Sequence, residues 1–324
     1  MQSKLDNMQS KESAHKYNVI IVTDLDGTLL DHHTYSWQAA KPALDQAKNK
    51  NIPIIPCTSK TLEETQKLIK TIGLDGPIIF ENGSGIALAD GSLIDLAPKY
   101  SEIVEKLETI KLANNFNFWG FHSMSVEDVM AQTQLSFEDA ANAKSRRYSE
   151  PFLWQGDEKS FNDFEHSCQE AGIDIVRGGR FYHALSRNVT KQRAIEHLKD
   201  YLKTPNAHII ALGDSNNDIP MLQNADTAIV VNNPTRSFPH LPKANNDVHY
   251  TSAYGPEGWN DAIINLLNNN VELLASIYSP KKFQTKDFKN HIACDLHPRV
   301  YNDGSLVCFD AVRNNHRSLC IMNI

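Results

Sequence analysis

The stretch YNVIIVTDLDGT, residues 17–28, decides the fold of this chain. Its first half, Tyr17–Thr23, is a short run rich in apolar and β-branched residues, which is typical of a strand buried on both faces of a sheet. Two acidic residues, Asp24 and Asp26, follow directly, and the glycine and threonine after them suit a turn. The stretch therefore predicts a buried strand that ends in a polar turn.

Strand and helix signals alternate along the segment that follows. Apolar residues recur at helical spacing over Ser36–Lys50, and a second apolar run covers Ile52–Cys57. A second helical pattern covers Leu62–Ile72, and Pro77–Phe80 is a third short strand signal. Because strands that alternate with helices are joined by right-handed crossovers, this order predicts a parallel sheet.

Polar clusters follow each of these three strands. They are Asp24–Thr28, Thr58–Lys60, which includes Ser59, and Glu81–Gly83. In open parallel sheets the ligand lies beyond the carboxyl ends of the strands. All three clusters are therefore candidates for one functional site.

The middle of the chain loses this alternation. Hairpin-like pieces occur over Gly85–Ile94, with Asp90-Gly91 as a turn signal, and amphipathic helices follow, such as Ser125–Leu135. The pattern indicates an inserted α+β cap at residues 85–187 that we expect to govern substrate specificity.

The alternation returns after the cap. A helix is predicted at Lys191–Leu202 and a strand at His208–Leu212; the polar loop Gly213–Asp218, a strand at Thr227–Val231 and a helix from Pro256 to about Tyr278 follow. The expected fold is thus an α/β doubly wound parallel sheet, with residues 17–84 and 188–278 forming the core around the inserted cap.

The two ends of the chain differ in their sequence patterns. Residues 1–16 are polar and mixed in charge, so we expect a flexible tail. Residues 279–324 begin with a basic link and continue with strand-like pieces around Val300-Tyr301 and Leu306–Phe309, with Asp303-Gly304 as a hairpin signal. We interpret this region as a small appendage of unknown role.

Composition excludes several classes of function. The formal net charge is −7 over 324 residues and no dense block of Lys or Arg occurs, which argues against a nucleic-acid partner. The five cysteines form no metal-type spacing, and no segment has the apolar length of a signal peptide or a membrane span. We therefore expect a cytoplasmic protein with reduced thiols, without a membrane or nucleic-acid partner.

The acidic residues indicate a magnesium site. Buried carboxylates are costly unless a cation pairs with them, and Asp24 and Asp26 stand at the end of a buried strand. Asp214 and Asp218 follow a second strand and can complete the site. Because Mg²⁺ prefers oxygen ligands and is often held by carboxylates together with a substrate phosphate, these four residues are the predicted metal ligands.

The same residues have the groups that phosphoryl transfer needs. Asp24 is the predicted nucleophile, which forms an aspartyl-phosphate, and Asp26, on the same side of an extended chain, is the predicted general acid and base. Thr58 can hydrogen-bond a phosphoryl oxygen, and Lys191 can neutralise charge on the nucleophile and the phosphate. A small anion that carries a phosphate is the expected ligand.

These motifs resemble the haloacid dehalogenase superfamily. The four motifs of that superfamily match Asp24–Thr28, Thr58, Lys191 and Gly213–Asp218. The resemblance implies a phosphatase or phosphomutase, because the second acidic residue of the first motif, Asp26 here, is absent from the dehalogenases. The inserted cap looks like the type found in sugar phosphatases of the superfamily.

Longer sequence motifs of the chain resemble those of the mannosyl-3-phosphoglycerate phosphatase family. The similarity extends from about Val19 to Leu267. It rests on six motifs: Thr23–Trp37, Cys57–Thr61, Glu81–Gly83, Ser149–Phe152, Gly178–His183 and Gly255–Trp259. Thr-Ser-Lys in place of the commoner Thr-Gly-Arg is a specific mark of this family. The chain departs from it at the third motif, where Lys191-Gln192 replaces the usual Lys-Gly, a change that could alter the local backbone.

The resemblance also implies how a substrate is bound. A phosphoglycerate group carries a second anion, for which the expected binding groups are Lys60, Arg180 and the amides of Gly178 and Gly179. Glu81, Asn82 and His183 are expected to hydrogen-bond sugar hydroxyls, and Ser59 lies beside them in the second motif. Spacing alone specifies neither the sugar nor the oligomeric state.

Two alternatives remain open at this stage. The first motif equally permits a phosphosugar mutase or a broad sugar phosphatase. A non-catalytic phosphosugar-binding regulator would use Asp24 and Mg²⁺ as receiver modules do, but such a switch has no need of a proton shuttle like Asp26 or of Lys191.

Overall fold

The computed structural model describes residues 17–178, 180–241 and 247–268, together with the backbone of the strands β13 (Arg299–Val300), β14 (Leu306–Arg313) and β15 (His316–Asn323). The predicted N-terminal tail, Gly179, the basic link and the predicted Asp303-Gly304 turn lie outside these residues, as does the end of the last predicted core helix. The chain divides into two compact units, Met1–Asn270 and Val271–Ile324.

The first unit is built on a parallel sheet. Its strand order is β12-β11-β10-β1-β2, and every neighbouring pair is parallel. The strands are β1 (Val19–Thr23), β2 (Ile54–Pro56), β10 (His208–Gly213), β11 (Thr227–Asn232) and β12 (Asp247–Tyr254). A single parallel bridge from Cys57 to Ile79 connects β2 to β3 (Ile78–Phe80). The predicted doubly wound core is thereby confirmed.

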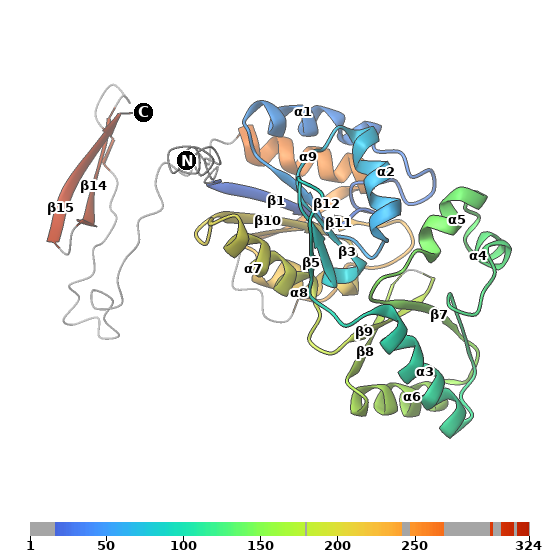
Figure 1. Ribbon diagram of the computed structural model, residues 1–324. Coiled ribbons are helices and arrows are strands. Elements are labelled where there is room, and N and C mark those ends of the chain that lie inside the picture. The colour runs from blue at the N-terminus through green and yellow to red at the C-terminus, as the bar shows by residue number, and fades with distance from the viewer. Residues whose placement is uncertain are drawn as a thin grey trace, which may run out of the picture. The chain divides into compact units, whose positions relative to one another are not determined.

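Helices cover both faces of this sheet (Figure 1). On one face lie α1 (Lys41–Asn49), α2 (Leu62–Ile72) and α9 (Gly255–Asn268), and on the other lie α7 (Lys191–Tyr201) and α8 (Ile219–Asn224). Successive residues of β1 supply the two cores, because side chains alternate across a strand.

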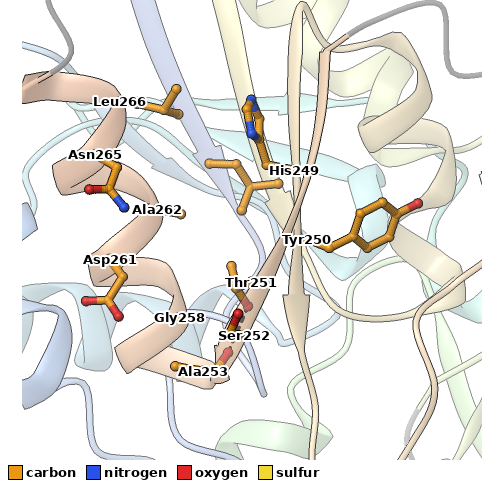
Figure 2. A pocket seen from close by; sticks show the side chains of 11 residues that line it. His249, Tyr250, Thr251, Ser252, Ala253, Gly258, Asp261, Ala262, Asn265 and Leu266 are labelled. Carbon is orange, nitrogen blue, oxygen red and sulfur yellow. Dashed lines mark hydrogen bonds between the residues drawn. The ribbon is translucent and has the colours of Figure 1, made fainter.

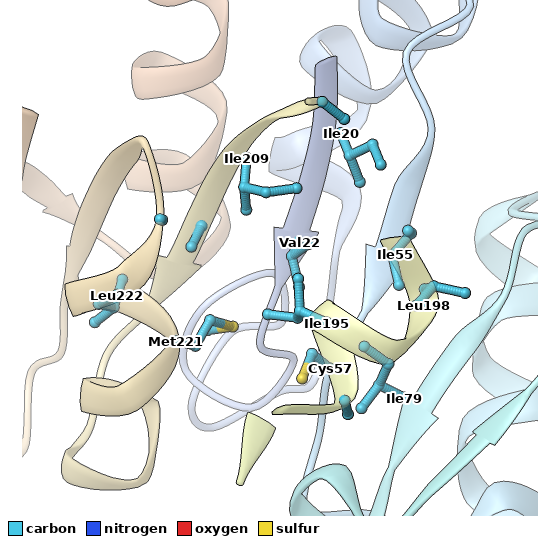
Figure 3. Packing of buried hydrophobic residues seen from close by; sticks show 14 of the residues in the cluster. Ile20, Val22, Ile55, Cys57, Ile79, Ile195, Leu198, Ile209, Met221 and Leu222 are labelled. Carbon is cyan, nitrogen blue, oxygen red and sulfur yellow. The ribbon is translucent and has the colours of Figure 1, made fainter. Parts of the chain in front are cut away.

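Ile20 and Val22 of β1 belong to the cluster on the α7 side, with Ile195 and Met221 (Figure 3). Ile21 faces the opposite way, into a cluster that contains residues of α1 and α9. The β1 strand is therefore buried on both faces, as its unbroken apolar run predicts.

An antiparallel sheet of order β6-β7-β9-β8 forms the inserted cap. Its strands are β6 (Phe118–Gly120), β7 (Glu150–Trp154), β8 (Ile173–Arg177) and β9 (Tyr182–Ser186), and its helices are α3 (Tyr100–Asn114), α4 (Val126–Thr133), α5 (Phe137–Lys144) and α6 (Glu158–Glu170). Aromatic side chains from both strands and helices form its core; Phe152 and Phe164 are fully buried. The expectation of an α+β insertion is confirmed.

The hairpin at the start of the insertion belongs structurally with the core. Strands β4 (Gly85–Ala87) and β5 (Leu93–Asp95) continue antiparallel from β3, and Gly91 makes the predicted turn with a φ of 85°. Ile86 packs in the same cluster as α7. The cap's own sheet begins only at β6.

The second unit contains a three-stranded antiparallel sheet, β13-β14-β15. The sequence predicted its first two strands approximately and missed β15. No helix within the described residues combines the length and the apolar character that a bilayer span would require.

Candidate active site

The carboxyl ends of β1 and β10 bring three buried acids together. Asp24 follows β1, and Asp214 and Asp218 lie in the loop after β10. One ligand oxygen from each of the three lies within 4.8 Å of the others. Because β1 and β10 are adjacent parallel strands, this meeting is a direct result of the topology.

Lys191 lies between two of these acids. Its Nζ is 2.6 Å from Asp24 Oδ1 and 2.7 Å from Asp218 Oδ1, and the side chain is only 1% exposed. Burial acts to lower the pKa of Lys191, but the charges of Asp218 and Asp24 outweigh it and raise that pKa. The ammonium group is therefore held charged beside the predicted nucleophile.

The departure at Gln192 leaves the start of α7 regular. Thr190 caps the helix by accepting a hydrogen bond from the Arg193 amide, and Lys191 is the first helical residue. The Gln192 side chain donates to Glu196 one turn along the same helix. A glycine at this position is thus not needed to direct Lys191 inward.

The acid cluster carries more negative charge than Lys191 can balance. Burial raises the pKa of Asp24 well above its ordinary value, Lys191 opposes this, and Asp218 and Asp214 add to it. Burial and Asp218 also raise the pKa of Asp214, to about 6. A nucleophilic carboxylate must be ionised, so a divalent cation that prefers oxygen ligands fits this donor set. When bound, such a cation would supply charge neutralisation to the carboxylates and to phosphate oxygens.

The oxygens of Asp218 and Asp214 are engaged differently. One oxygen of Asp218 pairs with Lys191, while the other accepts from the amides of Asp214 at 3.1 Å and Ser215 at 3.0 Å. Asp214 accepts a short 2.5 Å hydrogen bond from Asn233 Nδ2 and a longer one from Thr28. Asp218 therefore shapes the loop and holds Lys191, whereas Asp214 and Asp24 are the better placed to hold a cation.

Gly27 is required where the first motif passes this cluster. Its φ is 80°, and a Cβ there would lie 2.7 Å from Asn233 Nδ2 and 2.8 Å from Asp214 Oδ2. Asn233 itself was missed by the sequence analysis. The available signal was the pair Asn232-Asn233, which ends β11 and follows it at the same edge of the sheet.

Asp26 lies outside the acid cluster. Its Oδ2 is 2.9 Å from Lys60 Nζ, and the buried Oδ1 has no hydrogen-bond partner among the described residues. The structure thus gives the Asp26 carboxylate a lysine partner in place of the predicted metal contact. The unpartnered oxygen is available for proton exchange with a ligand.

The second motif approaches from β2. Thr58 is buried, and its hydroxyl accepts from the Lys60 amide at 3.2 Å. Lys60 also lies 5.3 Å from the ring centre of Tyr35. Burial acts to lower the pKa of Lys60, but Asp26 and Glu64 outweigh it and raise that pKa. The carbonyl of Ser59 accepts from Arg146 of the cap at 2.9 Å.

Glu81 plays a different part from the one expected, whereas Asn82 keeps a group for the expected one. Both oxygens of the buried Glu81 carboxylate are engaged by the segment Arg147–Ser149, so they are not free for a sugar hydroxyl. Asn82 Oδ1 accepts from Asn217 at 3.2 Å, while its buried Nδ2 has no partner among the described residues. Asn82 therefore keeps one donor that a ligand can use.

The cap contributes a neutral histidine. His183 is 7% exposed, and its Nδ1 has no partner within the described residues. Burial lowers its pKa to about 3, with added effects from the charges of Arg146 and Lys191. Arg180 is exposed, and Gly178 forms a turn by donating to the Phe181 carbonyl.

A separate cavity of about 380 Å³ lies between β12 and α9 (Figure 2). His249, Thr251 and Leu266 are among its lining residues, and none of the predicted site residues lines it.

Comparison with known proteins agrees with this geometry. The model of the haloacid dehalogenase-like hydrolase family matches residues 21–240. A glucosyl-3-phosphoglycerate/mannosyl-3-phosphoglycerate phosphatase of Persephonella marina is 35% identical over 272 residues, covering 77% of this chain and 97% of that protein. A protein of the same name from Methanococcoides burtonii is also 35% identical, with 78% and 99% covered.

Solved structures share the fold at lower identity. A protein from Thermoplasma acidophilum aligns with a TM-score of 0.60 and 20% identity, covering 78% of this chain and 99% of that one. The sucrose-phosphatase of Synechocystis aligns with a TM-score of 0.56 and 16% identity, covering 76% and 98%. With the family model matched over most of the chain and the acid cluster at the expected edge of the sheet, the chain belongs to the haloacid dehalogenase-like hydrolase family.

Proposed function

We propose that this chain is a Mg²⁺-dependent phosphatase that hydrolyses a glycosyl-3-phosphoglycerate, with mannosyl-3-phosphoglycerate as the first candidate, to the glycosylglycerate and phosphate. The observation that carries the proposal is the contact of buried Lys191 with Asp24 at 2.6 Å, beside two further buried acids. The substrate class comes from the names of the two 35% identical relatives.

The proposed reaction has two steps that use the same proton carrier. A carboxylate oxygen of Asp24 attacks phosphorus while the bond from phosphorus to the glycerate oxygen breaks, and Asp26 gives its proton to that departing oxygen. Water then attacks phosphorus, Asp26 takes up its proton, and phosphate leaves as Asp24 is regenerated. Asp26 Oδ1, which is buried without a partner among the described residues, is the oxygen we assign to these transfers.

Fixed donors support the phosphoryl group in this scheme. Lys191 holds one oxygen of Asp24 in place, so that the other can face phosphorus. We assign a phosphoryl oxygen to the Thr58 hydroxyl, and bound Mg²⁺ to Asp24 and Asp214. These assignments deliver positive charge and donors to the place where negative charge develops.

The second anion of the substrate has a candidate partner on the core. Lys60 lies beside Asp26, so a glycerate carboxylate that binds Lys60 would bring its phosphate-bearing oxygen close to the proton carrier. Asn82 Nδ2 and His183 Nδ1 have no partner in the described part of the chain, and we assign hydroxyl groups of the sugar to them. We retain Arg180 and the Gly178 turn as further contacts from the cap. A cytoplasmic location remains part of the prediction.

Phosphate release from defined substrates tests the proposal. The purified chain is incubated with Mg²⁺ and mannosyl-3-phosphoglycerate, glucosyl-3-phosphoglycerate or hexose phosphates. We expect free phosphate, with kcat/KM at least tenfold higher for a glycosyl-3-phosphoglycerate than for hexose phosphates. Equal rates on all phosphates would favour a broad sugar phosphatase, an isomeric phosphate product would indicate a mutase, and binding without turnover would indicate a regulator.

A further inference from the structure

The buried carboxylate of Glu81, in the turn after β3, holds a short loop segment of the cap. Glu81 is fully buried, and its oxygens accept from the amides of Arg147 at 2.9 Å, Tyr148 at 3.1 Å and Ser149 at 2.8 Å. The Ser149 hydroxyl donates a fourth hydrogen bond at 2.7 Å. Such charge-assisted hydrogen bonds, grouped on one side chain, are among the stronger polar contacts in a protein.

The turn that carries Glu81 packs between the segment Thr58–Lys60 and the start of α7. The amide of Glu81 donates to the Lys60 carbonyl at 2.9 Å, and the amide of Asn82 donates to the Thr58 carbonyl at 2.8 Å. On the other side, a Cβ at Gly83 would lie 2.4 Å from the Thr190 carbonyl oxygen, directly before Lys191. The turn therefore touches the loops of both Thr58 and Lys191.

The backbone of this turn is held in a costly conformation. Glu81 has a φ of 46° and Asn82 a φ of 58°, in the left-handed region that non-glycine residues rarely adopt. Strain of this kind persists only where the surrounding contacts over-determine it, and it concentrates at functional sites. The contacts of Glu81 on both sides supply that support.

The segment Arg147–Ser149 is connected to His183 through one pair of strands. Ser149 directly precedes Glu150, the first residue of β7, and β7 pairs with β9 so that Pro151 lies opposite His183. Burial lowers the pKa of His183, and the charges of Arg146 and Lys191 lower it further. Fixing Arg147–Ser149 therefore fixes the strand pair that carries His183.

We propose that Glu81 is a positioning residue that sets the place of the cap over Asp24 and thereby the preference for substrates that the cap must bind. The preference itself rests on the proposed function. Glu81 acts through Arg147–Ser149 and does not touch the substrate. A glutamine at this position keeps the shape but turns an amide group toward backbone N–H donors, so it cannot accept all four hydrogen bonds.

The test compares two substrates in matched variants. Glu81→Gln is set against Glu63→Gln, which removes the charge from an ion pair to the same segment: Glu63 Oε1 is 2.8 Å from Arg147 Nη2, at a partly exposed site. Kinetics are measured with mannosyl-3-phosphoglycerate and with p-nitrophenyl phosphate, which has no sugar for the cap to bind. We expect Glu81→Gln to lower the ratio of the two kcat/KM values at least tenfold, mainly through KM, and Glu63→Gln to change it less than twofold.

A second readout does not depend on the substrate. The single glutamine oxygen can face either the Arg147 amide or the amides of Tyr148 and Ser149, but not both sides. Hydrogen exchange at one or more of these three amides should therefore be at least tenfold faster in Glu81→Gln than in the wild type or Glu63→Gln. If the wild-type protein fails to hydrolyse mannosyl-3-phosphoglycerate, the proposed function fails, while the exchange rates still decide whether Glu81 holds the cap.

Two outcomes overturn the positioning role. One is unchanged exchange, and the other is an unchanged ratio of the two kcat/KM values. The second includes an equal fall with both substrates accompanied by a lower Tm, which is what a merely structural role predicts. If Glu81→Gln does not fold, Ser149→Ala replaces it, because it removes only the hydroxyl donor to Glu81. We expect that variant to lower the ratio about threefold, and no change in the ratio would equally overturn the role.

Discussion

Lys191 and Asp24 are far apart in the sequence, yet each determines the state of the other. The lysine is 1% exposed and would be costly to bury alone, while the aspartate lies among acids that oppose its ionisation. Their contact at 2.6 Å stabilises both charges. The state of the proposed nucleophile, Asp24, therefore depends on its neighbours as much as on its own position after β1.

Replacing Asp24 with asparagine separates chemistry from folding. We expect Asp24→Asn to lower phosphate release by more than about a thousandfold, because an amide cannot form the acyl-phosphate. Stability without metal should be equal or greater, since the pKa of Asp24 is raised and the charged form is disfavoured in the folded chain. Phosphate release and calorimetry measure the two effects, and an active, well-folded variant would refute the assigned nucleophile.

Residue types after buried strands were sufficient to predict Asp24, Asp214 and Asp218 as neighbours, because topology brings strand ends together. Lys191, at the start of α7, was predicted from the motif pattern and the charge that phosphoryl transfer requires. Residue types were not sufficient to predict the role of Glu81. Its carboxylate accepts hydrogen bonds from a cap segment that is more than 60 residues away in the sequence. Hydrogen-bond occupancy depends on tertiary packing, which no local pattern encodes.

The same limit applies to the secondary structure elements. The apolar strands β1, β10 and β11 were predicted nearly to the residue, because burial on both faces gives an unbroken signal. Strand β12 was missed, since it is an edge strand with alternating exposed polar residues, and such a segment resembles a loop. Its partner β11 supplies the pairing that the segment lacks by itself.

Strand β7 of the cap carries a buried acid that makes stability depend on pH. Glu150 is 2% exposed; burial raises its pKa from 4.5 to about 7, although hydrogen bonds from Tyr100 and the His122 amide oppose the change. Between these two values the folded state holds a proton that the unfolded state releases. The contribution of Glu150 is therefore full below pH 4.5 and is lost as pH rises through about 7.

We accordingly expect Glu150→Gln to become more stable relative to the wild type as pH rises from about 5 to 8. The gain is bounded at about 3 kcal/mol, because each unit of pKa is worth about 1.4 kcal/mol. Glutamine can still accept from His122 with its oxygen and donate to Tyr100 with its amide. Urea denaturation at several pH values measures the difference. Exposed Glu105→Gln is the control, and a difference that does not widen with pH would contradict the prediction.

At the scale of the whole molecule, the site exists only in the folded core. Asp24, Thr58, Lys191 and Asp214 come from separate segments, and the cap is inserted between the second and the third of them. Asp24 and Asp214 are not held close together in the unfolded chain, so a cation that binds both binds only the folded protein. Its binding free energy therefore adds to the stability of the fold.

Mg²⁺ should consequently raise the thermal stability of the protein. With free Mg²⁺ at about a hundred times its Kd, the gain is about 2.7 kcal/mol, which for a unit of this size corresponds to a rise in Tm of at least about 5 °C. Calorimetry in EDTA and in excess Mg²⁺ measures the shift without any substrate. Asp214→Asn removes a clustered acid and should lose most of the shift, whereas Asp45→Asn, in an exposed ion pair of α1, should keep it. The same shift in both variants, or none in the wild type, would mean that the buried acids do not bind the cation.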